Sequence, residues 1–66
     1  MTGGTQQGRE VIFETIRLGP YMKVTAVDSQ TMLEVSVQGP SNARPQDLQK
    51  LAMNKLKLAL ERQKKS

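Results

Sequence analysis

Side chains that could carry out catalysis or bind a metal are sparse in this chain. It contains no His and no Cys, so the usual general base and the commonest metal ligands are missing. The acidic residues show no pairing that a fold would bring together, and no glycine-rich phosphate loop is present. The sequence therefore predicts a protein that is not an enzyme and that uses no cofactor or metal.

Lysines near the C-terminus form the one regularly spaced set of charged residues. Lys50, Lys57 and Lys64 are seven residues apart, which places them on one face of a helix. Together with Lys65, such a ridge would suit contact with the phosphates of a nucleic acid. A solvated helix face explains the ridge equally simply, and we favour that interpretation because Glu61 interrupts the run of positive charge.

Two runs rich in β-branched residues flank a polar segment in the middle of the chain. Residues 21–27 and 32–37 have strand character, and the polar residues 28–31 between them suit a hairpin connection. Residues 10–18 predict an earlier strand, which Gly19 and Pro20 end. The sequence thus predicts three consecutive antiparallel strands.

The face that the first strand buries is ambiguous. One set of alternate residues contains Phe13, and the other contains Ile12 and Ile16. We expect Phe13 to point inward, because burying the only Phe contributes more than burying one aliphatic residue. A bulge near Arg17 would then turn Leu18 inward as well.

A helix is predicted after the strands, with Pro45 in its first turn and Ser41 or Asn42 as its N-cap. Its apolar residues recur at spacings of three and four, which is typical of one buried stripe. They are Leu48, Leu51, Ala52, Leu56, Ala59 and Leu60.

These elements predict an α+β fold, a three-stranded antiparallel β-meander with one C-terminal α-helix packed on one face. Residues 10–62 would form the single β-β-β-α domain, between a disordered tail at 1–9 and a frayed C-terminus at 63–66. A chain of 66 residues buries little apolar surface, so its stability is expected to be marginal. A second copy or a protein partner would complete the core.

The face of the sheet away from the helix is the expected interaction surface. Its candidate residues, with two from beside the helix stripe, are Tyr21, Lys23, Thr25, Glu34, Ser36, Met53 and Leu58. We expect a non-catalytic interaction module that self-associates or binds a protein, with RNA binding through the basic helix as the alternative. No small-molecule substrate is indicated. Without a long apolar run or a signal peptide, the expected compartment is the cytoplasm and no membrane contact is predicted.

Three short runs of sequence resemble a family of short alphaproteobacterial proteins of unknown function. They are Glu-Val-Ile-Phe-Glu at 10–14, Tyr-Met-Lys-Val-Thr-Ala-Val-Asp at 21–28 and Glu-Val-Ser-Val-Gln-Gly-Pro at 34–40. In the helix, Leu51-Ala52 and Lys55-Leu56 are similar to that family's pattern. The resemblance covers about residues 10–60 and implies the β-β-β-α fold. It implies no activity, so it assigns no site.

Overall fold

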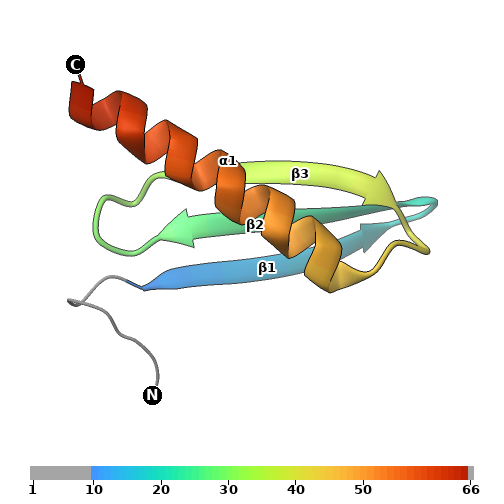
Figure 1. Ribbon diagram of the computed structural model, residues 1–66. Helices are drawn as coiled ribbons and strands as arrows, with labels where there is room; N and C mark the ends of the chain where they lie inside the picture. The colour runs from blue at the N-terminus through green and yellow to red at the C-terminus, as the bar shows by residue number, and fades with distance from the viewer. Residues whose placement is uncertain (1–9, 66) are drawn as a thin grey trace.

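Residues 10–65, which the structure describes, form three strands and one helix. The strands β1 (Val11–Leu18), β2 (Tyr21–Asp28) and β3 (Glu34–Pro40) come first, and the helix α1 (Pro45–Lys65) follows. The strands form one antiparallel sheet in the order β1-β2-β3, and α1 lies across one face of it (Figure 1). The predicted β-β-β-α meander is confirmed.

The computed structural model describes residues 10–65, with side chains as far as Gln63. The tail predicted at 1–9 and Ser66 lie outside the described residues. The helix continues to Lys65, beyond the domain boundary expected at residue 62.

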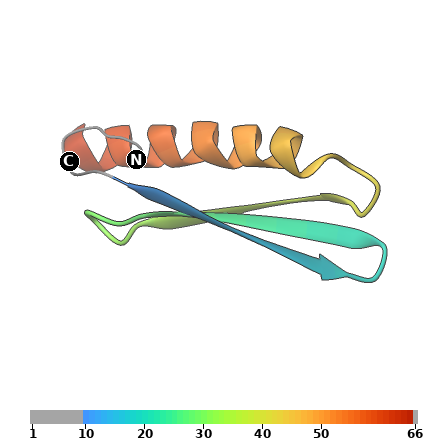
Figure 2. The same ribbon diagram turned by 90° about the horizontal axis from the view of Figure 1, so that it is seen from below.

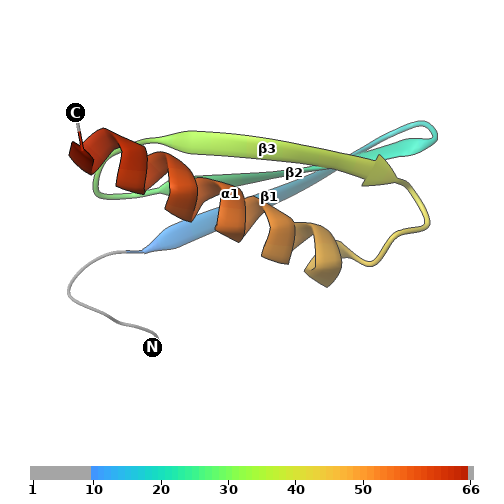
Figure 3. The ribbon, with the colours of Figure 1, turned by 45° about the horizontal axis from the view of Figure 1, so that its top comes forward.

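The ends of the elements are grouped at two ends of the sheet. The C-terminal end of α1, the β2–β3 turn and the start of β1 lie at one end (Figure 3). The β1–β2 turn and the start of α1 lie at the other end. The helix therefore runs the length of the sheet, obliquely to the strands.

Strand register decides which side chains share a face, because residues directly opposite each other in an antiparallel pair project to the same side. Phe13 lies opposite Ala26, on the side of α1. Pairing between β1 and β2 is unbroken from Val11 to Leu18, so the bulge predicted near Arg17 is absent. Leu18 consequently projects to the face away from α1, and the prediction that it turns inward is wrong.

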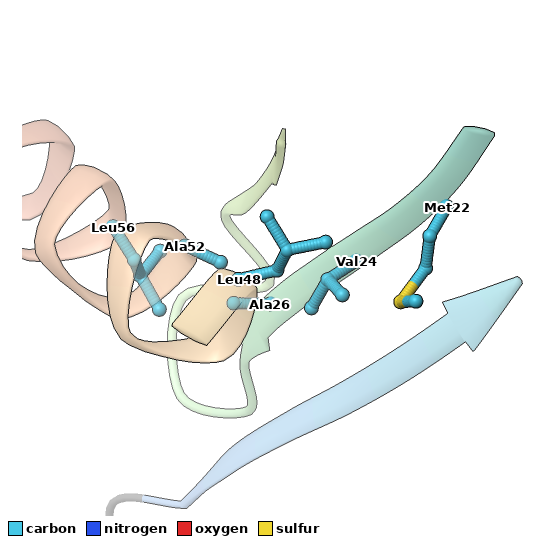
Figure 4. Packing of buried hydrophobic residues seen from close by; sticks show 6 residues of the cluster. All are labelled: Met22, Val24, Ala26, Leu48, Ala52 and Leu56. Atoms are coloured by element: carbon cyan, nitrogen blue, oxygen red, sulfur yellow. The ribbon is translucent and has the colours of Figure 1, made fainter. Parts of the chain in front are cut away.

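The hydrophobic core lies between α1 and the two strands beneath it. The fully enclosed apolar side chains, three from β2 and three from α1, are Met22, Val24, Ala26, Leu48, Ala52 and Leu56 (Figure 4). Gly39 in β3 allows the start of the helix to approach closely, since a Cβ there would lie 2.9 Å from Cδ2 of Leu48. Because Ala26, Gly39 and Ala52 are small, the helix can pack tightly on the sheet.

The helix packs against β2 and β3 and leaves most of β1 uncovered. Val11, at the start of β1, packs against the core. The sheet then twists, so β1 moves away from α1 toward its end (Figure 2). Phe13 is on the helix side as predicted, but it remains 37% exposed and is not a core residue.

The β2–β3 connection is longer than predicted. Oδ2 of Asp28, a buried residue, accepts hydrogen bonds from the backbone N–H of Thr31 (2.9 Å) and from its hydroxyl (2.8 Å). Met32 donates its N–H to the Asp28 carbonyl and has a φ of 63°, a left-handed conformation that lies outside the range of a regular strand. Placing Met32 in the third strand was therefore wrong, and that strand begins at Glu34.

Two predictions about the helix need correction. Arg44 immediately precedes α1, and its carbonyl accepts the N–H of Asp47 at 3.0 Å, so neither Ser41 nor Asn42 is the N-cap. Leu51 is 55% exposed and does not belong to the buried stripe. One residue turns the helix by about 100°, which carries Leu51 away from the sheet when Ala52 faces it.

Candidate protein-interaction surface

The face of the sheet opposite α1 carries no other element of the described chain (Figure 2). We call it the uncovered face. The register assigns to it Ile12, Glu14, Ile16, Leu18, Tyr21, Lys23, Thr25, Val27, Glu34, Ser36, Gln38 and Pro40.

All five of the strand residues predicted for the interface lie on this face. Thr25 and Ser36 are directly opposite each other, and their hydroxyl oxygens are 3.0 Å apart. Thr25 is only 8% exposed, so this pair links β2 to β3 and offers little surface to a partner. Tyr21 and Glu34 are exposed and Lys23 is half-buried. Tyr21 and Glu34 are therefore the most accessible of the strand residues that were predicted for the interface.

Large apolar side chains are exposed along β1 and at the start of β2. We call Ile12, Ile16, Leu18 and Tyr21 the apolar patch. Their exposed fractions are 55%, 41%, 49% and 55%. Leu18 lies opposite Tyr21, and Ile16 is the next residue of β1 on the same face. The patch extends the predicted surface onto β1.

Sequence reasoning missed part of this patch. It left Ile12 and Ile16 open between the two faces and assigned Leu18 to the core. The signal was the unbroken spacing of two residues through Ile12, Glu14, Ile16 and Leu18. A regular strand without a bulge places all four together.

The two helix residues predicted for the interface do not join the uncovered face. They are five residues apart, so Met53 and Leu58 differ by roughly 140° around the helix. Leu58 is 57% exposed and lies three residues from Lys55, whose side chain reaches β3. Met53 is half-buried on another side of the helix. The predicted set thus divides among separate surfaces.

The pattern of hydrogen bonds between β2 and β3 shows which backbone N–H and C=O groups of β3 point out of the sheet at its edge. The N–H of Asp28 donates to the carbonyl of Leu33 at 2.9 Å, which makes this pair hydrogen-bonded. Bonded and non-bonded pairs alternate in antiparallel sheets, so Glu34, Ser36 and Gln38 direct their backbone groups away from β2. Lys55 Nζ donates to the Ser36 carbonyl at 3.0 Å, and Pro40 has no N–H to offer. The edge of β3 is thus partly blocked.

The same rule applied to β1 gives a different result. Ser29 donates its N–H to the Glu10 carbonyl at 2.9 Å. The alternation then directs backbone groups out of the sheet at alternate residues of β1. These residues are Val11, Phe13, Thr15 and Arg17. No described element lies beyond β1, and the strand contains no Pro.

Family comparison matches residues 8–63 to a domain of unknown function, DUF6898. The chain belongs to this family. No curated protein and no solved structure matches the chain significantly. Membership of DUF6898 brings no residue role with it, so the functional argument depends on the surface alone.

Residues 10–65 contain no group of three metal-ligating side chains of the His, Cys, Asp or Glu type. Over the same residues, no helix combines the length and the apolar character that a membrane span needs.

The structure describes the side chains of two of the four lysines predicted to contact nucleic acid. Lys50 and Lys57 are exposed on α1, on the side away from the sheet. Lys64 and Lys65 belong to the last turn of the helix, and their side chains lie outside the described residues. Lys55 is hydrogen-bonded to β3 and is not part of this ridge.

Proposed function

We propose that this DUF6898 protein is a small non-catalytic interaction module of an alphaproteobacterial cytoplasm, which associates with further copies of itself through β1 and the uncovered face. The observation that carries the proposal is the apolar patch. Its four large side chains are each at least 41% exposed on one face of one sheet. Apolar side chains gathered on one face of a small protein mark an interaction site more often than single exposed ones do.

The energy available from the patch is limited. Fully burying one aliphatic side chain contributes about 1.5–3 kcal/mol, so covering the exposed half of four contributes on the order of 3–6 kcal/mol. Association costs about 4–15 kcal/mol in lost freedom of motion. The patch therefore needs additional contacts to hold a stable complex, and the exposed backbone of β1 lies beside it.

Charging the patch tests this proposal. The mass of the purified protein is measured by size-exclusion chromatography with light scattering over a range of concentrations. Wild-type protein is expected to associate, and Ile16→Glu is expected to be monomeric at the same concentrations. Met32→Glu is the matched control, because Met32 is a 71% exposed apolar residue in a turn outside the patch. Wild-type protein that stays monomeric, or association that survives Ile16→Glu, would overturn the proposal.

A second candidate function, nucleic-acid binding, is favoured by the exposure of Lys50 and Lys57 on one side of α1. We place it second because the phosphate contacts would come from one short helix. The only described aromatic residues are Phe13 and Tyr21, and they project to opposite faces of the sheet.

A further inference from the structure

We propose that a second copy of this chain pairs with β1 edge to edge, antiparallel, with the two-fold axis of the dimer at Thr15. The two sheets would become one continuous sheet. This inference rests on the proposed function in that it takes β1 as the side at which the protein associates, and it adds the edge-to-edge contact and the register.

We choose β1 over β3 because no described element covers the backbone groups at the edge of β1, whereas those at the edge of β3 are partly blocked. At β3 the Ser36 carbonyl already accepts from Lys55 Nζ, and Pro40 provides no donor. At β1 the backbone groups of alternate residues, Val11 to Arg17, meet no described element. An exposed edge strand of this length, without Pro or Lys, is a template for pairing with another strand.

Space for a second strand exists beside β1. The helix packs on β2 and β3. Only the start of α1 crosses over β1 (Figure 1), and there β1 has moved away from the helix (Figure 2). Phe13 is on the helix side and 37% exposed for the same reason. An antiparallel two-fold pair keeps both helices on one side of the joined sheet and both uncovered faces on the other.

The direction of the backbone N–H and C=O groups restricts the register in which two copies of β1 can pair. Outward-directed residues must lie opposite outward-directed residues if their N–H and C=O groups are to bond. This condition places the two-fold axis on a residue of the strand itself. Two positions of the axis give the longest overlap of the two strands. With the axis at Glu14, residues 11–17 pair with residues 11–17 of the second copy. With the axis at Thr15, residues 12–18 pair with residues 12–18 of the second copy.

Charge distinguishes these two registers. An axis at Glu14 would place this carboxylate directly opposite its own copy, and like charges opposite each other are destabilising. An axis at Thr15 places Glu14 opposite Ile16 of the second copy. It also places Arg17 opposite Phe13 of the second copy, which allows a cation–π contact. On the uncovered face, Ile12 then meets Leu18 of the second copy, so the two apolar patches join.

Disulfide trapping tests both the edge and the register, and the chain has no native Cys to interfere. In the proposed register Thr15 lies opposite its own copy in a hydrogen-bonded pair, with Cα atoms about 5.5 Å apart, within the range of a disulfide. Glu14 then lies diagonal to its copy at about 7–8 Å, which is too far. Under mild oxidation, Thr15→Cys is expected to form a covalent dimer and Glu14→Cys is expected to stay largely monomeric.

The outcomes separate this inference from the proposed function. Efficient crosslinking by Glu14→Cys would overturn the register. If neither variant crosslinks while both, in reduced form, still associate and Ile16→Glu still abolishes association, edge pairing is wrong and the proposed function stands. If the wild-type protein does not associate, both fail. Circular dichroism of the reduced variants verifies that each one is folded.

Discussion

Lys55 donates a hydrogen bond from Nζ to the backbone carbonyl of Ser36, 3.0 Å away, at the outer edge of β3. The helix thereby covers one edge of the sheet with a charged side chain, a common protection against unwanted strand pairing. The other edge, β1, has no such cover among the described residues. This asymmetry is the reason why we propose association at β1 and not at β3.

Removing the cover from β3 is expected to change assembly more than stability. Lys55→Met keeps the aliphatic stem and loses the hydrogen bond, which costs about 0.5–1.5 kcal/mol of unfolding free energy. With both edges then open, larger assemblies are expected by light scattering. Lys57→Met is the control, because Lys57 is exposed on the side of α1 away from the sheet. Masses equal to those of wild-type protein would show that Lys55 does not protect the edge.

Two leucines of α1 should respond very differently to truncation. Leu56 is fully buried, so Leu56→Ala is expected to lower the unfolding free energy by about 2–5 kcal/mol, enough to unfold a marginal small domain. Leu51 is 55% exposed, and Leu51→Ala should change it by less than about 0.5 kcal/mol. Urea denaturation followed by circular dichroism measures both. Equal losses would mean that Leu51 is a core residue after all.

Sequence patterns predicted the elements well because each has a strong local signal. Tyr21, Lys23 and Thr25 of β2 were correctly placed on the face away from the helix, and Pro45 correctly marked the start of α1. Local signals do not report where the helix crosses the sheet. The face of Phe13 was predictable, but its exposure depends on α1 packing over β2 and β3, a tertiary choice to which Gly39 contributes.

Two other errors, at Leu18 and Met32, concern a predicted bulge and the geometry of a turn. Leu18 was assigned inward because a bulge was expected near Arg17. The strand is regular, and Leu18 stays exposed, as apolar residues commonly do. Met32 adopts a left-handed conformation because its N–H and that of Thr31 both bond to Asp28, an arrangement that composition alone does not specify. Residue types predict that residues 28–31 form a turn, but the hydrogen bonds to Asp28 decide the conformation of that turn.

The hydroxyl pair across β2 and β3 should behave as a coupled unit. Thr25→Val or Ser36→Ala alone is expected to cost about 1 kcal/mol of unfolding free energy, because the remaining hydroxyl loses its partner. The double variant should cost less than the sum of the two. A double-mutant cycle by urea denaturation gives the coupling. Strict additivity would show that the 3.0 Å contact contributes nothing.

Reversing the lysine ridge tests the second candidate function. If Lys50 and Lys57 contact phosphates, Lys50→Glu with Lys57→Glu should abolish binding to a fluorescent single-stranded RNA and flatten its salt dependence. We expect instead that wild-type protein binds this RNA weakly and that the double variant keeps the association state of wild-type protein. Tight, salt-sensitive RNA binding lost in the double variant would move nucleic-acid binding to first place.

The most direct test of association through β1 is amide hydrogen exchange measured by NMR at low and high protein concentration. The amides of Phe13, Thr15 and Arg17 point away from β2, so they should exchange quickly in the monomer and become protected when a second strand binds. The amides of Ser36 and Gln38, at the outer edge of β3, should be unaffected by concentration. Protection of the three β1 amides at high concentration is the predicted result. Exchange at β1 that does not depend on concentration, in a sample that nevertheless associates, would contradict pairing at this edge.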